Sequence, residues 1–175
     1  FEIAQIARGF SDHGPQDARR SGQRLIYLDT NVLLSLYCPD DLSAAADAWY
    51  ARNDEPVSIS PWTVIEFRAN IGLRVRKRML SRAMGIATMK LFDDAASANF
   101  HLLSPAPVHF NQASDWLAKP ECALRSADAL HLAIAFGGGC KQFVSFDQPL
   151  GVAARKLGLA YLLLKPKKQR RLLDQ

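Results

Sequence analysis

Short apolar runs alternate with helix-like segments along residues 24–164, and this alternation constrains the fold more than any other feature of the chain. The runs have the length and composition of strands, and they lie at residues 24–28, 56–60, 101–104, 142–146 and 159–164. Strands separated by helices form parallel sheets with helices on both faces. We therefore expect an α/β fold, a three-layer α/β/α sandwich with a mainly parallel central sheet.

Helix boundaries between these runs are marked by capping residues. Ser60 and Pro61 are suited to the N-cap and the first position of a helix that reaches Arg78. Ser126 is expected to cap a helix that stops at Gly137-Gly-Gly139. Further helices are expected from Asn31 onward and at residues 41–52, 81–100, 109–118 and 149–157.

Four acidic residues stand in apolar sequence: Asp29, Glu66, Asp128 and Asp147. Asp29 ends the first predicted strand and Asp147 ends the fourth, so both are expected at the edge of a parallel sheet where ligands bind. Burial of an unpaired carboxylate costs several kcal/mol. A divalent cation is the usual compensation when several carboxylates converge.

Three of these acids also have a purely structural interpretation. Asp29 is suited to cap the helix that begins near Asn31, and Asp147 to cap the helix that follows it. Asp128 lies in the first turn of its helix, where its negative charge interacts favourably with the helix dipole. Glu66 is harder to explain in this way. On a helical wheel it shares one side with Trp62, Ile65, Ala69 and Leu73, which predicts that it projects from a largely apolar, inward-facing stripe.

Histidine and cysteine residues give no site of their own. His131 follows Asp128 by three positions and has leucines on both sides, so we interpret it as a buried structural histidine. Cys38, Cys122 and Cys140 form no CxxC motif. Their odd number favours a reducing compartment, the cytoplasm, with neither a disulfide framework nor a zinc site.

Basic residues are concentrated in two places on a chain whose net charge is +5. One group lies within residues 68–82 and the other in the tail, residues 165–175. Basic clusters on a chain with buried-looking acids indicate a polyanionic partner. A solvated helix face and a solubilising tail are the alternative interpretation.

Four segments resemble, in order and spacing, the motifs of PIN-domain ribonucleases, and most closely those of VapC-type toxins of bacterial toxin–antitoxin pairs. The segments are Leu28-Asp-Thr-Asn-Val32, Thr63-Val-Ile-Glu-Phe67, Ser126-Ala-Asp-Ala-Leu-His-Leu-Ala133 and Val144-Ser-Phe-Asp147. The resemblance spans residues 24–164, which we expect to be one PIN-like nuclease domain.

This resemblance implies an endoribonuclease that depends on Mg²⁺ or Mn²⁺ and leaves 5′-phosphate and 3′-hydroxyl ends. The matching metal-binding and catalytic acids are Asp29, Glu66, Asp128 and Asp147, and Thr30 and Ser145 occupy supporting hydroxyl positions. One or two metal ions supply an activated water and stabilise the leaving oxygen. An acidic site repels RNA, so basic residues must hold its backbone. The predicted RNA-binding residues are Arg74, Arg76, Lys77 and Arg78.

The resemblance also implies protein partners: a cognate antitoxin and a second copy of the chain. Leu73, Met84 and Leu91 are candidate residues for a homodimer interface. Residues 1–23 precede the usual start of the family fold and are expected to be an antitoxin-like tail, a cloning remnant or a natural extension that docks on the domain without joining its sheet.

Two alternatives stay open at this point. Leu28-Asp-Thr-Asn-Val32 also resembles the first motif of haloacid-dehalogenase-like phosphatases, whose aspartate is a nucleophile, although Asn31 stands where those enzymes place a second acid. The other alternative is a non-catalytic RNA-binding domain.

Overall fold

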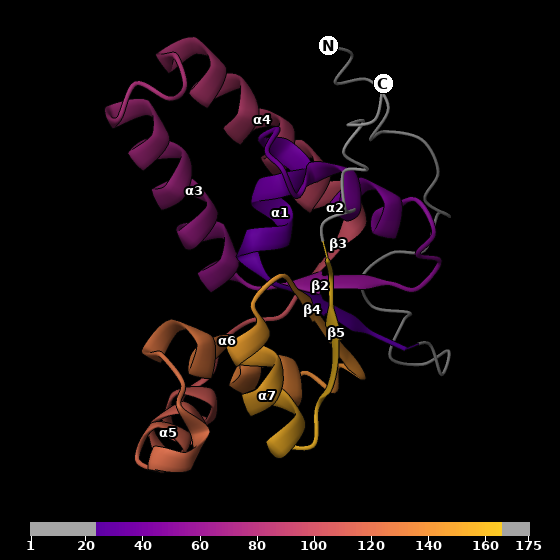
Figure 1. The fold of residues 1–175 in the computed structure, drawn as a ribbon, viewed down its shortest axis with the longest axis vertical. Helices are drawn as coiled ribbons and strands as arrows, with labels where there is room; N and C mark the ends of the chain where they lie inside the picture. The colour runs from indigo at the N-terminus through magenta and orange to yellow at the C-terminus, as the bar shows by residue number, and fades with distance from the viewer. Residues whose placement is uncertain (1–23, 166–175) are drawn as a thin grey trace, which may run out of the picture.

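The computed structural model describes residues 24–165, and these residues form a five-stranded sheet in which every neighbouring pair of strands is parallel (Figure 1). The strands are β1 (Ile26–Leu28), β2 (Val57–Ile59), β3 (Phe100–Leu102), β4 (Gln142–Ser145) and β5 (Ala160–Leu163), and their order in the sheet is β3-β2-β1-β4-β5. The predicted α/β fold is confirmed, and each strand lies within two residues of its predicted position.

Helices occupy every connection between strands. They are α1 (Thr30–Tyr37), α2 (Ser43–Tyr50), α3 (Pro61–Arg76), α4 (Arg82–Asn99), α5 (Pro107–Leu117), α6 (Ser126–Gly137) and α7 (Gln148–Lys156), with a short 3-10 turn at Pro120–Cys122. α5 begins two residues before its predicted start because Pro107 takes the first helical position and the side chain of His109 accepts a hydrogen bond from the amide of Ala106.

Two hydrophobic cores lie on opposite faces of the sheet. Tyr27 and Phe143 face α5, α6 and α7, whereas their strand neighbours Leu28 and Val144 face α1, α2, α3 and α4. Successive side chains of a strand point to opposite faces, so each short strand contributes to both cores. The rings of Tyr27 and Phe143 stack with centroids 5.2 Å apart, and on the other face Phe67 stacks on Phe92 at 4.1 Å.

Helices α3 and α4 form a hairpin that projects from the sheet (Figure 1). α3 begins as predicted, with Ser60 at its N-cap, Pro61 at its first position and a reciprocal capping box between Ser60 and Thr63. α4 approaches α3 closely at Gly85, where an added Cβ would lie 2.6 Å from a methyl group of Val75. A larger residue at position 85 would therefore force Val75 or one of the two helices to shift.

An arginine in the left-handed conformation ends α3. Arg78 has φ 58°, and the amide groups of Arg78 and Met79 donate to the carbonyl oxygens of Val75 and Arg74. This is the hydrogen-bond pattern of a Schellman motif, in which glycine usually occupies the left-handed position. The cost of this conformation for a residue with a Cβ is on the order of 1 kcal/mol.

No helix within residues 24–165 is long and apolar enough to cross a lipid bilayer. The three cysteines are buried, and no disulfide joins them. The expectations for residues 1–23, and for the tail beyond Lys165, concern parts of the chain outside the described residues.

Candidate functional site

The predicted strand-end acids meet where the strand order of the sheet reverses. Asp29 follows β1 and Asp147 follows β4, and these two strands are neighbours, with Leu28 paired to Val144. From β1 the chain continues to β2 and β3 on one side, whereas β4 and β5 lie on the other. Open parallel sheets bind their ligands at the carboxyl ends of the strands at such a reversal.

The hydroxyl of Ser145 connects these two strand ends. It donates a 2.5 Å hydrogen bond to Oδ2 of Asp29 and accepts hydrogen bonds of 2.9 Å from Nδ2 of Asn31 and from the amide of Asp147. A hydroxyl has one proton and two lone pairs. Because both lone pairs of Ser145 are engaged, its proton is directed at Asp29.

Asp29 is not held by the helix that follows it. It occupies the N-cap position of α1, but its side chain makes no capping hydrogen bond. The structural interpretation of Asp29 as a helix cap is therefore wrong. Only 7% of the residue is exposed, and Oδ1 has no hydrogen-bond partner among the described residues.

Asp147 combines a capping role with a position at the site. Oδ1 accepts a 2.9 Å hydrogen bond from the amide of Leu150, which confirms the cap predicted for α7. Its main-chain oxygen accepts a hydrogen bond from the hydroxyl of Tyr161 on β5. In the part of the chain that is described, no group donates to Oδ2, so this oxygen is available to a ligand.

The apolar stripe predicted around Glu66 does not face inward. The buried residues of α3 are Thr63, Phe67 and Ile71, whereas Ile65 is 58% exposed and Leu73 40% exposed. The wheel prediction fails because α3 leaves the sheet as one arm of a hairpin and packs mainly on the side that faces α1 and α4. Trp62, at the start of the helix, packs instead against the core that contains Tyr27. Glu66 lies at the margin of that side and is half-buried.

Hydrogen bonds fix one oxygen of Glu66. Oε2 accepts from the hydroxyl of Thr30 at 2.6 Å and lies 2.6 Å from Nε2 of His131. Within residues 24–165, Oε1 has no partner. Thr30, a predicted supporting residue, therefore contacts a predicted ligand, although that ligand is Glu66 and not the adjacent Asp29.

Sequence reasoning assigned no role at the site to His131, which the structure brings into contact with Glu66. Its spacing from Asp128, three positions along one helix, was the available signal, because residues three apart share a helix face. His131 is 1% exposed, and its Nδ1 lies 2.9 Å from the hydroxyl of Tyr27.

Asp128 lies in the first turn of α6, as predicted, and is half-buried. The expected cap is wrong: the helix already includes Ser126, and Arg125 occupies the N-cap position without a side-chain capping bond. Burial raises the pKa of Asp128, and the negative charge of Asp147 raises it further.

Electrostatic coupling among the acids is visible in their pKa shifts. Burial is the largest cause of the raised pKa of Asp29. His131 and the hydrogen bond from Ser145 oppose the shift, and the charges of Asp128 and Glu66 add to it. Burial also disfavours the charged form of Glu66, but the hydrogen bond and the electrostatic attraction of His131, together with the bond from Thr30, lower its pKa overall.

These donors suit a hard divalent cation. Asp29, Glu66 and Asp147 each have one oxygen held by protein hydrogen bonds and one without a partner in the described chain. Among residues 24–165, no three His, Cys, Asp or Glu side chains are gathered closely enough to enclose a metal ion directly. This arrangement fits Mg²⁺, which keeps several waters and contacts one or two carboxylates together with substrate phosphates.

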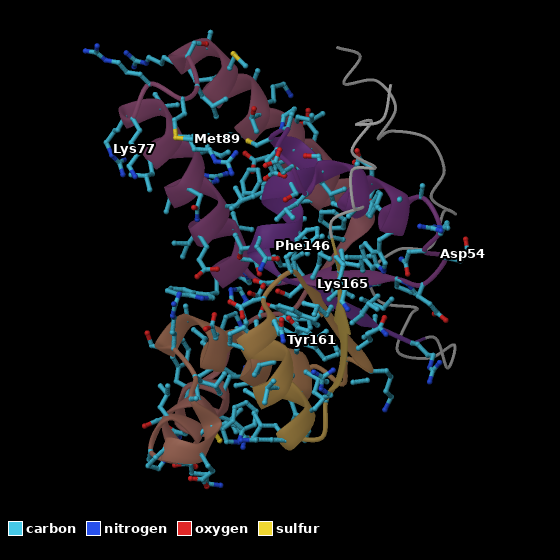
Figure 2. The ribbon with its side chains drawn as sticks, in the orientation of Figure 1. Asp54, Lys77, Met89, Phe146, Tyr161 and Lys165 are labelled. Carbon is cyan, nitrogen blue, oxygen red and sulfur yellow. The ribbon has the colours of Figure 1, made fainter. Side chains whose placement is uncertain are left out.

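The predicted RNA-binding residues lie at the outer end of the α3–α4 hairpin. Figure 2 shows Lys77 there, far from Phe146 at the edge of the sheet. Arg76, Lys77 and Arg78 are exposed and, among the described residues, form no ion pair. Arg74 differs, since its guanidinium lies 3.9 Å from Asp40 and only 25% of its side chain is exposed.

Several solved structures share this fold at low sequence identity. The structure of the Mycobacterium tuberculosis toxin VapC20, described as cleaving the sarcin-ricin loop, is 20% identical with a TM-score of 0.60, covering 73% of this chain and 94% of that one. FitAcB from Neisseria gonorrhoeae is 19% identical with a TM-score of 0.55, covering 82% of this chain and 99% of that one.

A toxin–antitoxin complex from Klebsiella pneumoniae is 14% identical with a TM-score of 0.55, covering 82% of this chain and 99% of that one. No curated protein sequence is significantly similar to the chain. The model of the PIN domain family matches residues 26–156, which include all four motif segments and confirm the resemblance. With three quarters of its length matched, the chain belongs to the PIN-domain family.

Proposed function

We propose that this protein is a divalent-metal-dependent endoribonuclease that hydrolyses phosphodiester bonds of RNA. The observation that carries the proposal is that Asp29 and Asp147 lie at the ends of the neighbouring strands β1 and β4 and are connected through Ser145, with Glu66 and Asp128 close enough for their charges to act on these two acids. Three of these acids have one oxygen oriented by the protein and the other available. An acidic site of this kind, in a fold shared with a toxin described as cleaving the sarcin-ricin loop, supports RNA as the substrate.

Each part of the proposed site has a distinct task. Asp29 and Asp147, connected through Ser145, would hold Mg²⁺ or Mn²⁺ at the strand ends, with Glu66 and Asp128 completing the site from α3 and α6. When bound, the metal supplies an activated water and charge stabilisation for the phosphate. The protein side chains orient the ligands and exclude bulk water from Asp29.

RNA binding is assigned to the end of the hairpin. Glu66 and Lys77 are eleven positions apart on one helix, which corresponds to about 16 Å along its axis. Arg76, Lys77 and Arg78 would therefore contact phosphates several nucleotides from the cleaved bond. The ion pair of Arg74 with Asp40 makes Arg74 the least available member of the predicted set.

Protein partners are part of the proposal. The fold is shared with toxin–antitoxin complexes, which supports inhibition by a cognate antitoxin. For a homodimer, Leu73 and Met84 are exposed and available, whereas Leu91 packs against the core and would contribute little. The cysteine pattern favours the cytoplasm as the place of action.

The deciding experiment measures cleavage of RNA in Mg²⁺ and in Mn²⁺ by the wild type, Asp29→Ala, Glu66→Ala and a control, Asp54→Ala. Asp54 is an exposed acid at a turn away from the site (Figure 2). We expect cleavage by the wild type and the control, with 5′-phosphate ends, and its loss in the other two variants. Equal cleavage by all four proteins would remove the assignment to this site, and RNA binding without cleavage by the wild type would indicate a non-catalytic RNA-binding domain.

A further inference from the structure

A network of hydrogen bonds leads from the core to Glu66, and Glu66 determines which groups in it donate and which accept. A carboxylate can only accept, so Nε2 of His131, 2.6 Å away, must carry the proton and donate to Oε2. In a neutral imidazole the other nitrogen is then an acceptor. When the ring is neutral, the hydroxyl of Tyr27, 2.9 Å from Nδ1, donates to it. When the ring is protonated, both nitrogens donate, and Nε2 still donates to Glu66.

The oxygen of Tyr27 is in turn supported by the start of α3. Ser60 Oγ and Thr63 Oγ1 lie 2.8 Å and 3.1 Å from it. Both hydroxyls accept a backbone amide in the capping box, Ser60 from Thr63 and Thr63 from Ser60. They also lie 3.1 Å from each other, so each has its proton available for Tyr27 or for the other hydroxyl. The hydroxyls of Ser60, Thr63 and Tyr27 and both nitrogens of His131 therefore all have hydrogen-bond partners in this network.

Water cannot substitute for these contacts. Tyr27, Ser60 and Thr63 are completely buried and His131 is 1% exposed. A buried polar group that loses its partner costs about 1–3 kcal/mol, which holds the arrangement in place. The network also crosses three separate elements, since Tyr27 lies on β1, Ser60 precedes α3 and His131 lies on α6.

Glu66 needs such support because its surroundings leave its side chain room to move. Its helix leaves the sheet, its neighbours Ile65 and Ala69 are exposed, and it is only half-buried. A glutamate fixed in one conformation loses on the order of 1.5–2 kcal/mol of side-chain entropy. Two hydrogen bonds of 2.6 Å to the same oxygen restrict it and leave Oε1 for a ligand.

We propose that His131 is a positioning residue which, held by Tyr27, fixes Glu66 with Oε1 available to a bound divalent cation. This role rests on the proposed metal-dependent function and adds the device that orients one of its ligands. Groups that orient metal ligands in this way typically contribute tenfold to a hundredfold to metal affinity. The network makes no contact with RNA in this role and acts through Glu66 alone.

The test measures Mn²⁺ affinity of metal-stripped, RNA-free protein by calorimetry. His131→Leu keeps the volume but removes the donor, and we expect roughly tenfold to a hundredfold weaker binding. His131→Gln places an amide N–H near the position of Nε2 and is expected to recover most of the affinity. Tyr27→Phe, which keeps the ring stacked on Phe143, is expected to weaken binding several-fold.

The matched control is Tyr37→Phe, which removes a buried phenol hydroxyl from the core on the other face of the sheet. It should bind Mn²⁺ like the wild type. If His131→Leu does not fold, as judged by circular dichroism, the comparison of Tyr27→Phe with Tyr37→Phe decides. Wild-type affinity in folded His131→Leu, or equal affinity in the two phenylalanine variants, would overturn the positioning role.

A second measurement reads the geometry without metal. Nitrogen-15 NMR of the imidazole at pH 8.5 should find a proton of His131 on Nε2, and a neutral ring with its proton on Nδ1 would overturn the arrangement. The two proposals fail separately. Mn²⁺ binding that follows the expected order without RNA cleavage would end the nuclease proposal alone, whereas cleavage with unchanged affinity in His131→Leu would end the positioning proposal alone. A wild type that binds no Mn²⁺ would end both.

Discussion

Ser145 donates a 2.5 Å hydrogen bond to Asp29 across 116 positions of sequence. The contact joins the ends of β1 and β4, and the same hydroxyl accepts from Asn31 and from the amide of Asp147. One serine therefore contacts Asp29, the side chain of Asn31 and the backbone of Asp147. The family resemblance predicts a supporting hydroxyl at this position, and the geometry gives it a physical task.

Two replacements of Ser145, one without and one with a hydroxyl, test the role of this group. Ser145→Ala leaves the Asn31 amide and the Asp147 N–H without their acceptor, and should lower the free energy of unfolding by about 1–3 kcal/mol. RNA cleavage should fall roughly tenfold to a hundredfold, because Asp29 and Asp147 lose their common orienting group. Ser145→Thr keeps the hydroxyl and should retain most of the activity. Equal activity in the two variants would refute the role of the hydrogen bonds.

Charge at Asp29 should destabilise the protein when no metal is bound. Burial raises the pKa of Asp29 in the folded state, so the folded protein binds a proton more tightly than the unfolded chain. Stability therefore falls as the pH rises from the unfolded pKa through the raised, folded one. Each unit of pKa difference corresponds to about 1.4 kcal/mol.

Asp29→Asn removes this charge and keeps an acceptor for Ser145. In EDTA at pH 7 the variant should be more stable than the wild type, and the difference should shrink toward pH 4. Urea denaturation across that range measures both quantities. A variant less stable than the wild type at pH 7 would show that the carboxylate is already compensated.

With metal bound, the wild type should be more stable than Asp29→Asn. A ligand that binds only the folded protein stabilises it by about 2.7 kcal/mol at a hundred times its dissociation constant. Mg²⁺ or Mn²⁺ should therefore raise the melting temperature of the wild type, EDTA should abolish the gain, and Asp29→Asn should show little of it. An equal rise in both proteins would place the cation elsewhere.

The sequence predicts the sheet well because its strands are short apolar runs separated by helical segments. Asp29 and Asp147 were located by the same reasoning, since a residue that ends a parallel strand must lie at one edge of the sheet. Here local pattern and tertiary position coincide.

The same reasoning does not predict the surroundings of Glu66 and His131. Wheel geometry gives the sides of α3 correctly but does not reveal which side is covered, because the packing partners α1 and α4 come from other parts of the chain. The contacts of His131 are with Tyr27 and Glu66, 104 and 65 positions away, and no local spacing encodes them.

Basic residues at the end of the hairpin should govern the salt dependence of RNA binding. Alanine at Arg76, Lys77 and Arg78 together should weaken binding at low salt, and reduce the slope of log affinity against log salt by about 2. A control with three exposed cations replaced elsewhere, Arg52, Lys119 and Lys141, should leave the slope nearly unchanged. Equal slopes in the two triple variants would indicate general charge attraction and not a binding surface.

Arg78 offers a sharper test, because its backbone and its charge predict opposite effects. Arg78→Gly relieves the left-handed conformation at φ 58° and should raise the free energy of unfolding by roughly 1 kcal/mol. The same change removes one cation and should weaken RNA binding. Lys77→Gly is the matched control, since it removes the same charge at an ordinary φ of −79° and should lower stability. Chemical denaturation together with RNA titration separates the two effects. If Arg78→Gly gains stability and binds RNA as tightly as the wild type, the arginine contributes no phosphate contact, and RNA binding must be sought on another surface.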